Sequence, residues 1–218
     1  MKNTKIRTAI FYADVHEAQN LEHFGAKFLR NYKVFSKEIS LWEYKNHAFF
    51  YINSGIGLIN AAIFAQKIIA KFMITNIINY GACGANATID FYKMKNQLIF
   101  PEKFYLLDVK TPWYPPGQLP YEPEFYQNNK IGKNSILGSS NSFIFKKEQV
   151  SEFTFVSFFD MEAFAFAQVS EKNNSNFYCI KYLTDQIENN SEIEEVNLAI
   201  KKGSKKAVKF VLELLLQL

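Results

Sequence analysis

The chain reads Ile-Thr-Asn-Ile-Ile-Asn-Tyr at residues 74–80 and Gly-Ala-Cys-Gly at residues 81–84, and this stretch decides the fold class. A short apolar run that ends in glycines is typical of a buried strand. The preceding residues, 58–72, have apolar side chains at helical spacing and follow Ser-Gly-Ile-Gly at 54–57. A helix that leads into a buried strand indicates an α/β protein. The glycines at 81–84 are interpreted either as a tight turn or as a close approach of the backbone to a ligand.

The same alternation continues outward on both sides. Strands are predicted at residues 6–13, 97–100, 104–109, 135–139, 153–158 and 176–183, and a hairpin is formed by residues 32–44 and 47–53 around Asn46. Helices are predicted at residues 15–30, at 160–172, and from a capping box of Ser191 and Glu194 to about Leu215. The pattern favours an α/β three-layer sandwich, in which helices flank a central mixed and twisted sheet. We expect a single domain over residues 1–218.

Composition excludes several classes of function. The 218 residues are 48% hydrophobic, which is enough to fill a large core, and the formal net charge is only +4. Lysines and glutamates alternate, so they indicate a solvated face rather than a nucleic-acid interface. No apolar run approaches the ~20 residues that span a membrane, and the first residues show no signal-peptide pattern. We therefore expect a cytoplasmic protein with neither membrane nor nucleic acid as a partner.

The metal-ligating residue types are few and scattered. The two cysteines, Cys83 and Cys179, match no metal spacing and are expected to be buried reduced thiols. The histidines form no paired ligand motif; they are His16, His23 and His47. The sequence predicts no metal site and no cofactor.

Three acids follow predicted strands, where ligands of open α/β sheets collect. They are Glu17, Glu162 in the segment Phe-Asp-Met-Glu-Ala at 159–163, and Asp185 in Leu-Thr-Asp at 183–185. Carboxylates in different surroundings can divide the work of breaking a sugar–base bond. The alternative for each acid is a solvated surface position, and Phe143 can equally be a core residue. Their clustering at strand ends favours the chemical interpretation.

Taken in order, these segments resemble the purine nucleoside phosphorylase/hydrolase superfamily, and most closely its 5′-methylthioadenosine/S-adenosylhomocysteine nucleosidases. Met-Glu-Ala at 161–163 matches a ribose motif of the family, and Thr-Asp at 184–185 is similar to its Ser-Asp pair. The other similar segments are residues 13–21, 54–62, 79–84, 117–120 and 140–144.

The resemblance implies hydrolysis of an N-ribosyl bond in a nucleoside, without metal or cofactor, by a homodimer. It gives Glu17 the role of general base on water and Asp185 that of general acid toward purine N7. Glu162 accepts from the ribose hydroxyls. The implied substrate-binding residues also include Met161 under the sugar, Phe143 on the base, Ile144 at its edge, Ile56, Ala82 and Lys181.

Two departures from the family pattern leave alternatives open. Ala82 replaces a serine that helps to hold the water, and Lys181 replaces an arginine. A phosphate-dependent phosphorylase is the first alternative, although Asn79 stands where those enzymes have an arginine. A nucleoside-binding protein without activity is the second. The Pro-rich loop at 112–123, with Trp113 and Tyr114, is predicted to shape the pocket for an apolar 5′ substituent. The sequence does not distinguish methylthioadenosine, S-adenosylhomocysteine, deoxyadenosine-type and futalosine-type substrates.

Overall fold

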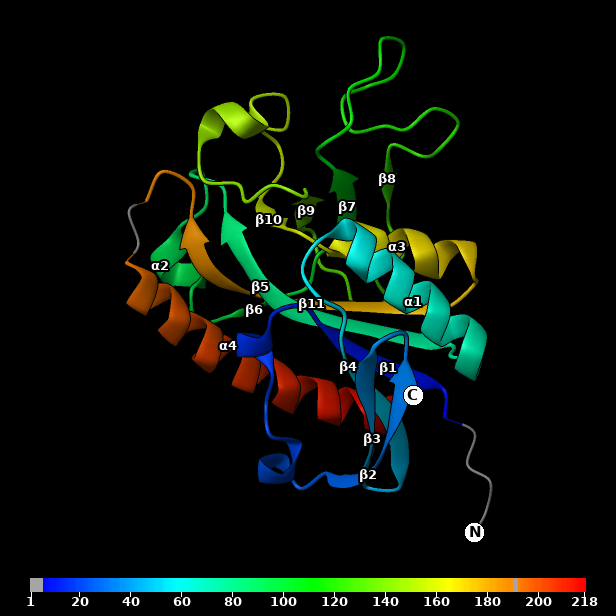
Figure 1. Ribbon diagram of the computed structural model, residues 1–218. Coiled ribbons are helices and arrows are strands. Elements are labelled where there is room, and N and C mark those ends of the chain that lie inside the picture. Colours follow the sequence, from blue (N-terminus) through cyan, green and yellow to red (C-terminus); the bar gives the residue numbers. More distant parts are fainter. Residues whose placement is uncertain (1–5, 190–191) are drawn as a thin grey trace.

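The computed structural model describes residues 6–189 and 192–218, and its strands form one sheet with helices on both faces (Figure 1). The strand order is β2-β3-β4-β1-β5-β10-β9-β7-β8, and β11 pairs with both β5 and β6. Both parallel and antiparallel pairs occur along this order. The predicted three-layer α/β sandwich around a mixed sheet is confirmed.

The strands of the first half are β1 (Thr8–Tyr12), β2 (Lys27–Val34), β3 (Lys37–Tyr44), β4 (His47–Asn53), β5 (Asn76–Ala85) and β6 (Leu98–Ile99). The second half adds β7 (Lys103–Leu106), β8 (Phe125–Tyr126), β9 (Ile136–Ser139), β10 (Phe158–Asp160) and β11 (Asn176–Gln186). The helices are α1 (Leu58–Phe72), α2 (Phe91–Met94), α3 (Ala163–Lys172) and α4 (Ile193–Leu214). Short 3₁₀ turns lie at Val15–Glu17, Leu21–Phe24, Lys147–Val150 and Leu215–Gln217.

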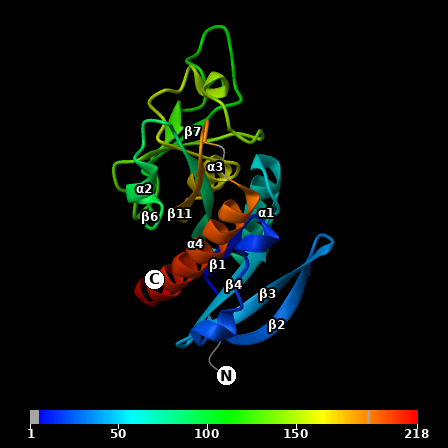
Figure 2. The same cartoon turned by 90° about the vertical axis from the view of Figure 1, so that its left-hand side faces the viewer.

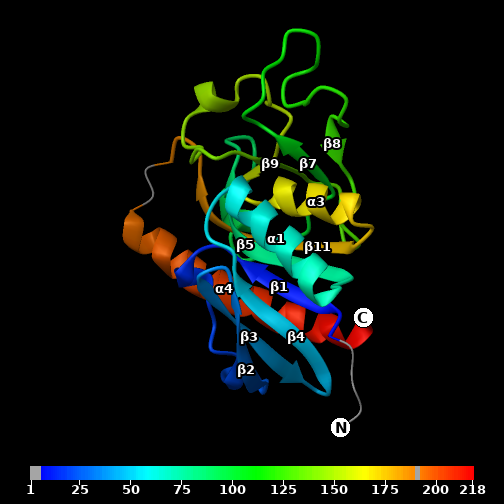
Figure 3. The same ribbon diagram turned by 45° about the vertical axis from the view of Figure 1, so that its right-hand side comes forward.

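Helices α1 and α3 lie side by side on one face of the sheet, and α4 covers the other (Figures 1 and 3). The face under α1 and α3 buries residues such as Phe11, Phe50 and Phe166. The face under α4 buries Tyr80, Tyr182 and the apolar stripe of α4 itself. Because β5 and β11 are covered on both faces, their central residues are mainly apolar. The exceptions are Asn79 in β5 and Lys181 in β11.

The hairpin of β2 and β3 and the loop between β7 and β8 lie at opposite ends of the molecule (Figure 2). The predicted helix at residues 15–30 is wrong. Two 3₁₀ turns replace it, and Gly25 ends the second of them with a φ of 84°. Lys27–Val34 then pair with β3, so cross-strand hydrogen bonds override the helical spacing of the apolar residues.

Other boundaries also differ. Residues 81–84 are not a turn, since β5 continues to Ala85. Of the strand predicted at 153–158, only Phe158 belongs to one, namely β10. Helix α1 begins and ends as predicted. The capping box at Ser191 lies outside the described residues.

Candidate active site

The site lies beside β5 where two neighbouring strands leave a gap. On one edge of β5, β1 pairs as far as Asn79, whereas β10 pairs from Gly84 onward. In the described part of the chain no strand pairs with residues 80–83 on this edge. Because β1 ends here and β10 runs in the opposite direction, the backbone N–H groups in the gap are available to side chains.

Glu17 fills this gap with its carboxylate. Its Oε1 accepts a hydrogen bond from the Ala82 N–H at 2.6 Å, and its Oε2 accepts from the Ala13 N–H at 2.9 Å and the Asp14 N–H at 3.2 Å. Asp14 caps the 3₁₀ turn that presents Glu17. Burial raises the pKa of Glu17, while the Lys181 charge and these N–H donors oppose the rise. Glu17 is therefore a buried acid with the donors that an ionised carboxylate needs.

The glycines of β5 make room for two of the acids. A Cβ on Gly81 would lie 2.8 Å from Glu17 Oε1, and one on Gly84 would lie 2.9 Å from Asp185 Oδ2. Both distances are too short for a side chain. The backbone is thus closely approached here, by carboxylates of the same chain. Close approach to a ligand stays a prediction.

Glu162 stands at the start of α3 and meets a loop from the other half of the chain. Its Oε1 accepts a hydrogen bond from the Gly57 N–H at 2.9 Å. Burial, followed by repulsion from Asp160, raises the pKa of Glu162 to about 8, and the Lys181 charge counteracts the rise. Gly57 has a φ of 100°, a backbone conformation that only glycine adopts readily. This conformation directs the Gly57 N–H toward the Glu162 carboxylate.

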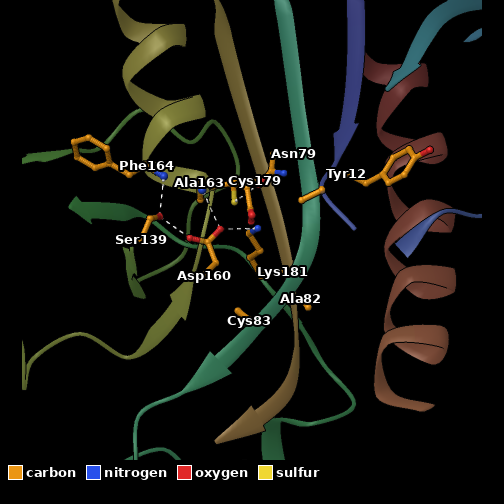
Figure 4. A network of polar contacts seen from close by, with 12 residues as sticks. Tyr12, Asn79, Ala82, Cys83, Ser139, Asp160, Ala163, Phe164, Cys179 and Lys181 are labelled. Carbon is orange, nitrogen blue, oxygen red and sulfur yellow. Dashed lines mark hydrogen bonds and ion pairs between the residues drawn. The ribbon is translucent and has the colours of Figure 1, made fainter. Parts of the chain in front are cut away.

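Asp160 and Lys181 form a buried ion pair beneath these acids (Figure 4). The Lys181 Nζ lies 2.8 Å from Asp160 Oδ2, and both side chains are almost fully enclosed. Burial opposes the charge of Lys181, but the attraction of Asp160 raises its pKa above the usual value. The remaining Asp160 contacts come from Ser139 Oγ at 2.5 Å and the Ala163 N–H at 2.9 Å. Sequence reasoning assigned no role to Asp160 or Ser139.

Asp185 lies near the end of β11, beyond an irregularity between Leu183 and Asp185. The Thr184 hydroxyl donates to Asp185 Oδ1 at 2.6 Å. Burial raises the pKa of Asp185, and the Thr184 hydrogen bond opposes this. An acid that keeps its proton to higher pH is suited to proton donation.

Two of the apolar and aromatic candidates are more exposed to solvent than Glu17 and Glu162. Phe143 is 59% exposed and Ile56 is 49% exposed, so the core alternative for Phe143 is wrong. Ile144 is buried, and Met161 is partly buried. The Leu58 N–H donates to Asn141 Oδ1 at 3.2 Å, which ties the loop before Phe143 to the start of α1. The structure thereby draws the two loops that carry Ile56 and Phe143 together.

A cavity of about 460 Å³ lies elsewhere. It is enclosed by α2, β6 and the first half of α4, and none of Glu17, Glu162 and Asp185 lines it. The site acids are instead packed within the protein. Among residues 6–189 and 192–218, no group of three His, Cys, Asp or Glu side chains has a geometry that could hold a metal ion. In the same residues no helix combines the length and apolarity that crossing a membrane requires.

Carboxylates at the strand ends of a layered α/β fold form an arrangement that suits the cleavage of glycosidic bonds. A family model described as the phosphorylase superfamily matches residues 7–128. A 5′-methylthioadenosine/S-adenosylhomocysteine nucleosidase of Buchnera aphidicola is 30% identical over 210 residues, which cover 85% of this chain and 89% of that protein. The nucleosidase of the same name from Maridesulfovibrio salexigens is 28% identical, with 75% and 79% covered.

Solved structures agree on the fold. The 5′-methylthioadenosine/S-adenosylhomocysteine nucleosidase of Helicobacter pylori, with butyl-thio-DADMe-Immucillin-A, has a TM-score of 0.84 at 19% identity and covers 97% of this chain and 100% of that one. The futalosine hydrolase of the same organism has a TM-score of 0.83 at 20% identity, with the same shares covered. The chain belongs to the phosphorylase superfamily. Within it, the chain groups with the 5′-methylthioadenosine/S-adenosylhomocysteine nucleosidases, as the sequence resemblance predicted.

Proposed function

We propose that this protein hydrolyses the N-ribosyl bond of a 5′-substituted adenosine, of the methylthioadenosine or S-adenosylhomocysteine type, to free adenine and the sugar. The observation that carries the proposal is the set of carboxylates around β5, of which Glu17 and Glu162 are buried and Asp185 is partly buried. Each has a different set of partners: Glu17 has backbone N–H donors, Glu162 meets Gly57, and Asp185 meets Thr184. The names of the curated relatives support the substrate class.

In the proposed reaction Glu17 takes a proton from the attacking water. Its ionised form is supported by the Ala82, Ala13 and Asp14 N–H groups. The sugar leaves through an oxocarbenium-like transition state, as in other glycoside hydrolyses. Asp185, whose pKa is raised by burial, supplies a proton to purine N7. Asp185 therefore assists cleavage of the bond to the base, and Glu17 assists addition of the water.

Ribose and base binding fall to the remaining residues. Glu162 accepts hydrogen bonds from the ribose hydroxyls, with Met161 under the sugar. Phe143 stacks on the base, backbone groups at Ile144 read its edge, and Ile56 and Ala82 line the pocket. Lys181 does not touch the substrate in this proposal. It counters the summed negative charge of Asp160, Glu17 and Glu162.

The phosphorylase alternative has less support. A phosphate dianion needs an uncompensated cation, and bidentate arginine contacts are the usual solution. Asn79 is buried with Cys179 Sγ 3.8 Å from its Oδ1, and the nearby Lys181 is already paired with Asp160. Neither supplies a bidentate contact for phosphate.

We also propose a homodimer in the cytoplasm. An apolar groove on the outer side of α1 is lined by Phe35, Ala62, Ile63, Ala70 and Val169, together with Gln66 and Lys67. The loop between β7 and β8 extends from the body (Figure 1). Trp113 in this loop is 88% exposed. A second copy that packs on the α1 groove would cover apolar surface, and the loop would close the 5′ end of the partner's pocket.

The test is adenine release from a small panel of purified nucleosides, with and without phosphate. Methylthioadenosine and S-adenosylhomocysteine should release adenine at the same rate in both buffers. Glu17→Gln and Asp185→Asn should each lower this rate by about 10²- to 10⁴-fold. Strict phosphate dependence would establish the phosphorylase instead. Tight binding of methylthioadenosine without turnover would establish the nucleoside-binding protein.

A further inference from the structure

Tyr182 is a buried tyrosine of β11 that neither the sequence motifs nor the proposed mechanism uses. Its side chain is 2% exposed and lies in the cluster of residues beneath α4. A Cβ on Gly203 of α4 would come within 2.1 Å of the Tyr182 ring. A glycine inside a helix costs stability relative to alanine, so the gap that Gly203 leaves serves to admit this ring. The ring is thus fixed between the sheet and α4.

The hydroxyl of Tyr182 reaches the carboxylate of Glu17. It lies 3.4 Å from Glu17 Oε1, the same oxygen that accepts from the Ala82 N–H. Within the described residues the other hydrogen bonds to this carboxylate come from backbone N–H groups, so Tyr182 is the side-chain donor. Tyr182 and Ala82 are register partners on adjacent parallel strands. The facing position therefore carries a methyl group and offers no competing hydroxyl.

Tyr182 and Lys181 approach Glu17 from different faces of the sheet. Successive residues of a strand point to opposite faces, and Tyr182 packs under α4 while Lys181 pairs with Asp160 near the start of α3. Burial, and then the Glu17 charge, raise the pKa of Tyr182 far above its usual value. The hydroxyl therefore keeps its proton at working pH and acts as a donor to Glu17.

We propose that Tyr182 is a positioning residue, whose hydroxyl keeps the Glu17 carboxylate ionised and directed at the attacking water. The proposal rests on the proposed function, in which Glu17 is the general base. A hydrogen bond to the ionised form of an acid favours that form, so loss of the hydroxyl makes Glu17 easier to protonate. Other titratable groups also face or act on Glu17 and stay in place when only this hydroxyl is removed; they are Lys181, Glu162, Tyr12, Tyr51 and Tyr80.

The experiment compares Tyr182→Phe with the wild type in the pH profile of kcat/KM for methylthioadenosine. The acid limb should move up by about 0.5 to 1 pH unit, as expected for loss of one long hydrogen bond of ordinary strength. KM should stay unchanged, because the side chain does not contact substrate, and the loss of rate should be concentrated at low pH. A merely structural role would lower activity at all pH values without moving the limb.

Tyr178→Phe is the matched control. Tyr178 lies on the same strand and in the same buried cluster, and no hydrogen bond from its hydroxyl is recorded among the described residues. This variant should keep the wild-type profile. Gly203→Ala provides a second route, since the added Cβ displaces the Tyr182 ring without changing any residue at the site. It should also move the acid limb upward.

The proposal is overturned if Tyr182→Phe is folded and active but has the wild-type acid limb, or if Tyr178→Phe moves the limb equally. Should Tyr182→Phe fail to fold, Gly203→Ala decides by the same criterion. Failure of the proposed function has a different signature, because the wild type itself would then release no adenine from methylthioadenosine.

Discussion

Glu17 and Glu162 are both almost fully buried, yet the protein surrounds them differently. Glu17 receives three backbone N–H donors, whereas Glu162 receives one and faces the negative charge of Asp160. Burial raises the pKa of both acids. The comparison teaches that burial alone does not assign a role. The number of donors and the sign of the nearest charge separate an acid equipped to act as a base from one that gains or loses a proton near neutrality.

The largest effect is expected from replacing the two acids in turn. Glu17→Gln should lower kcat by about 10²- to 10⁴-fold, because general base catalysis typically contributes that much. Its KM should change little. Glu162→Gln should act mainly through KM, because the amide cannot become the carboxylate that accepts hydrogen bonds from the ribose hydroxyls. Steady-state kinetics with methylthioadenosine separates the two. Equal effects on kcat and KM in both variants would remove the distinction between these acids.

Breaking the buried ion pair should give the next largest effect, this time on stability. Lys181→Met leaves the Asp160 carboxylate without its cation, which should cost about 3 to 5 kcal/mol of unfolding free energy. Asp160→Asn combined with Lys181→Met removes both charges and should recover much of this loss. Urea denaturation measures both variants. If the double variant is no more stable than Lys181→Met, the pair does not act as a unit.

The glycines of β5 allow a smaller and more local test. Gly81→Ala places a Cβ 2.8 Å from Glu17 Oε1 and Gly84→Ala places one 2.9 Å from Asp185 Oδ2. Each should cost about 1 to 3 kcal/mol through overpacking. Gly81→Ala should disturb the acid limb of kcat/KM and Gly84→Ala the alkaline limb, because they displace the base and the acid respectively. The assigned roles are contradicted if Gly81→Ala shifts the alkaline limb or Gly84→Ala shifts the acid limb.

The last test concerns the pH dependence of stability and the proton on Glu162. Its pKa of about 8 in the folded protein exceeds the value of about 4.3 for an exposed glutamate, so the folded state favours the protonated form. This contribution to stability is complete below about pH 4.3 and is lost as the pH rises to about 8. Glu162→Gln stays neutral, so its melting temperature should fall less over this range than that of the wild type. If the melting temperatures of the wild type and Glu162→Gln change equally with pH, the titrating group is not Glu162.

Much of the fold could be predicted because local signals agreed with tertiary packing. Helix α1 follows Ser-Gly-Ile-Gly and has apolar residues at helical spacing, and its bounds are as predicted. Residues 15–30 misled because the apolar positions 21, 24 and 28 fit a helix, while Gly25 and the pairing of β2 with β3 decide otherwise. The glycines at 81–84 were open to interpretation as a turn because their partners are distant in sequence. Gly81 makes room for Glu17, and Gly84 makes room for Asp185.

The site was less accessible to sequence reasoning. The structure places Glu17, Ala82 and Lys181 together, and it places Glu162 against the Gly57 loop, in agreement with the motif order. The partners that set their protonation come from distant strands. Asp160 meets Lys181 across the sheet, and Tyr182 reaches Glu17 from β11. Two features of the sequence could have indicated the pair of Asp160 and Lys181. Asp160 stands two residues before Glu162, and Lys181 stands within an otherwise apolar strand.

The central claim is that water, activated at Glu17, attacks the sugar. The most direct measurement is the reaction with methylthioadenosine in ¹⁸O-labelled water in the presence of phosphate, followed by mass spectrometry of the sugar product. The account predicts methylthioribose that carries the label at its new hydroxyl, with no sugar phosphate formed. An unlabelled sugar 1-phosphate would contradict it.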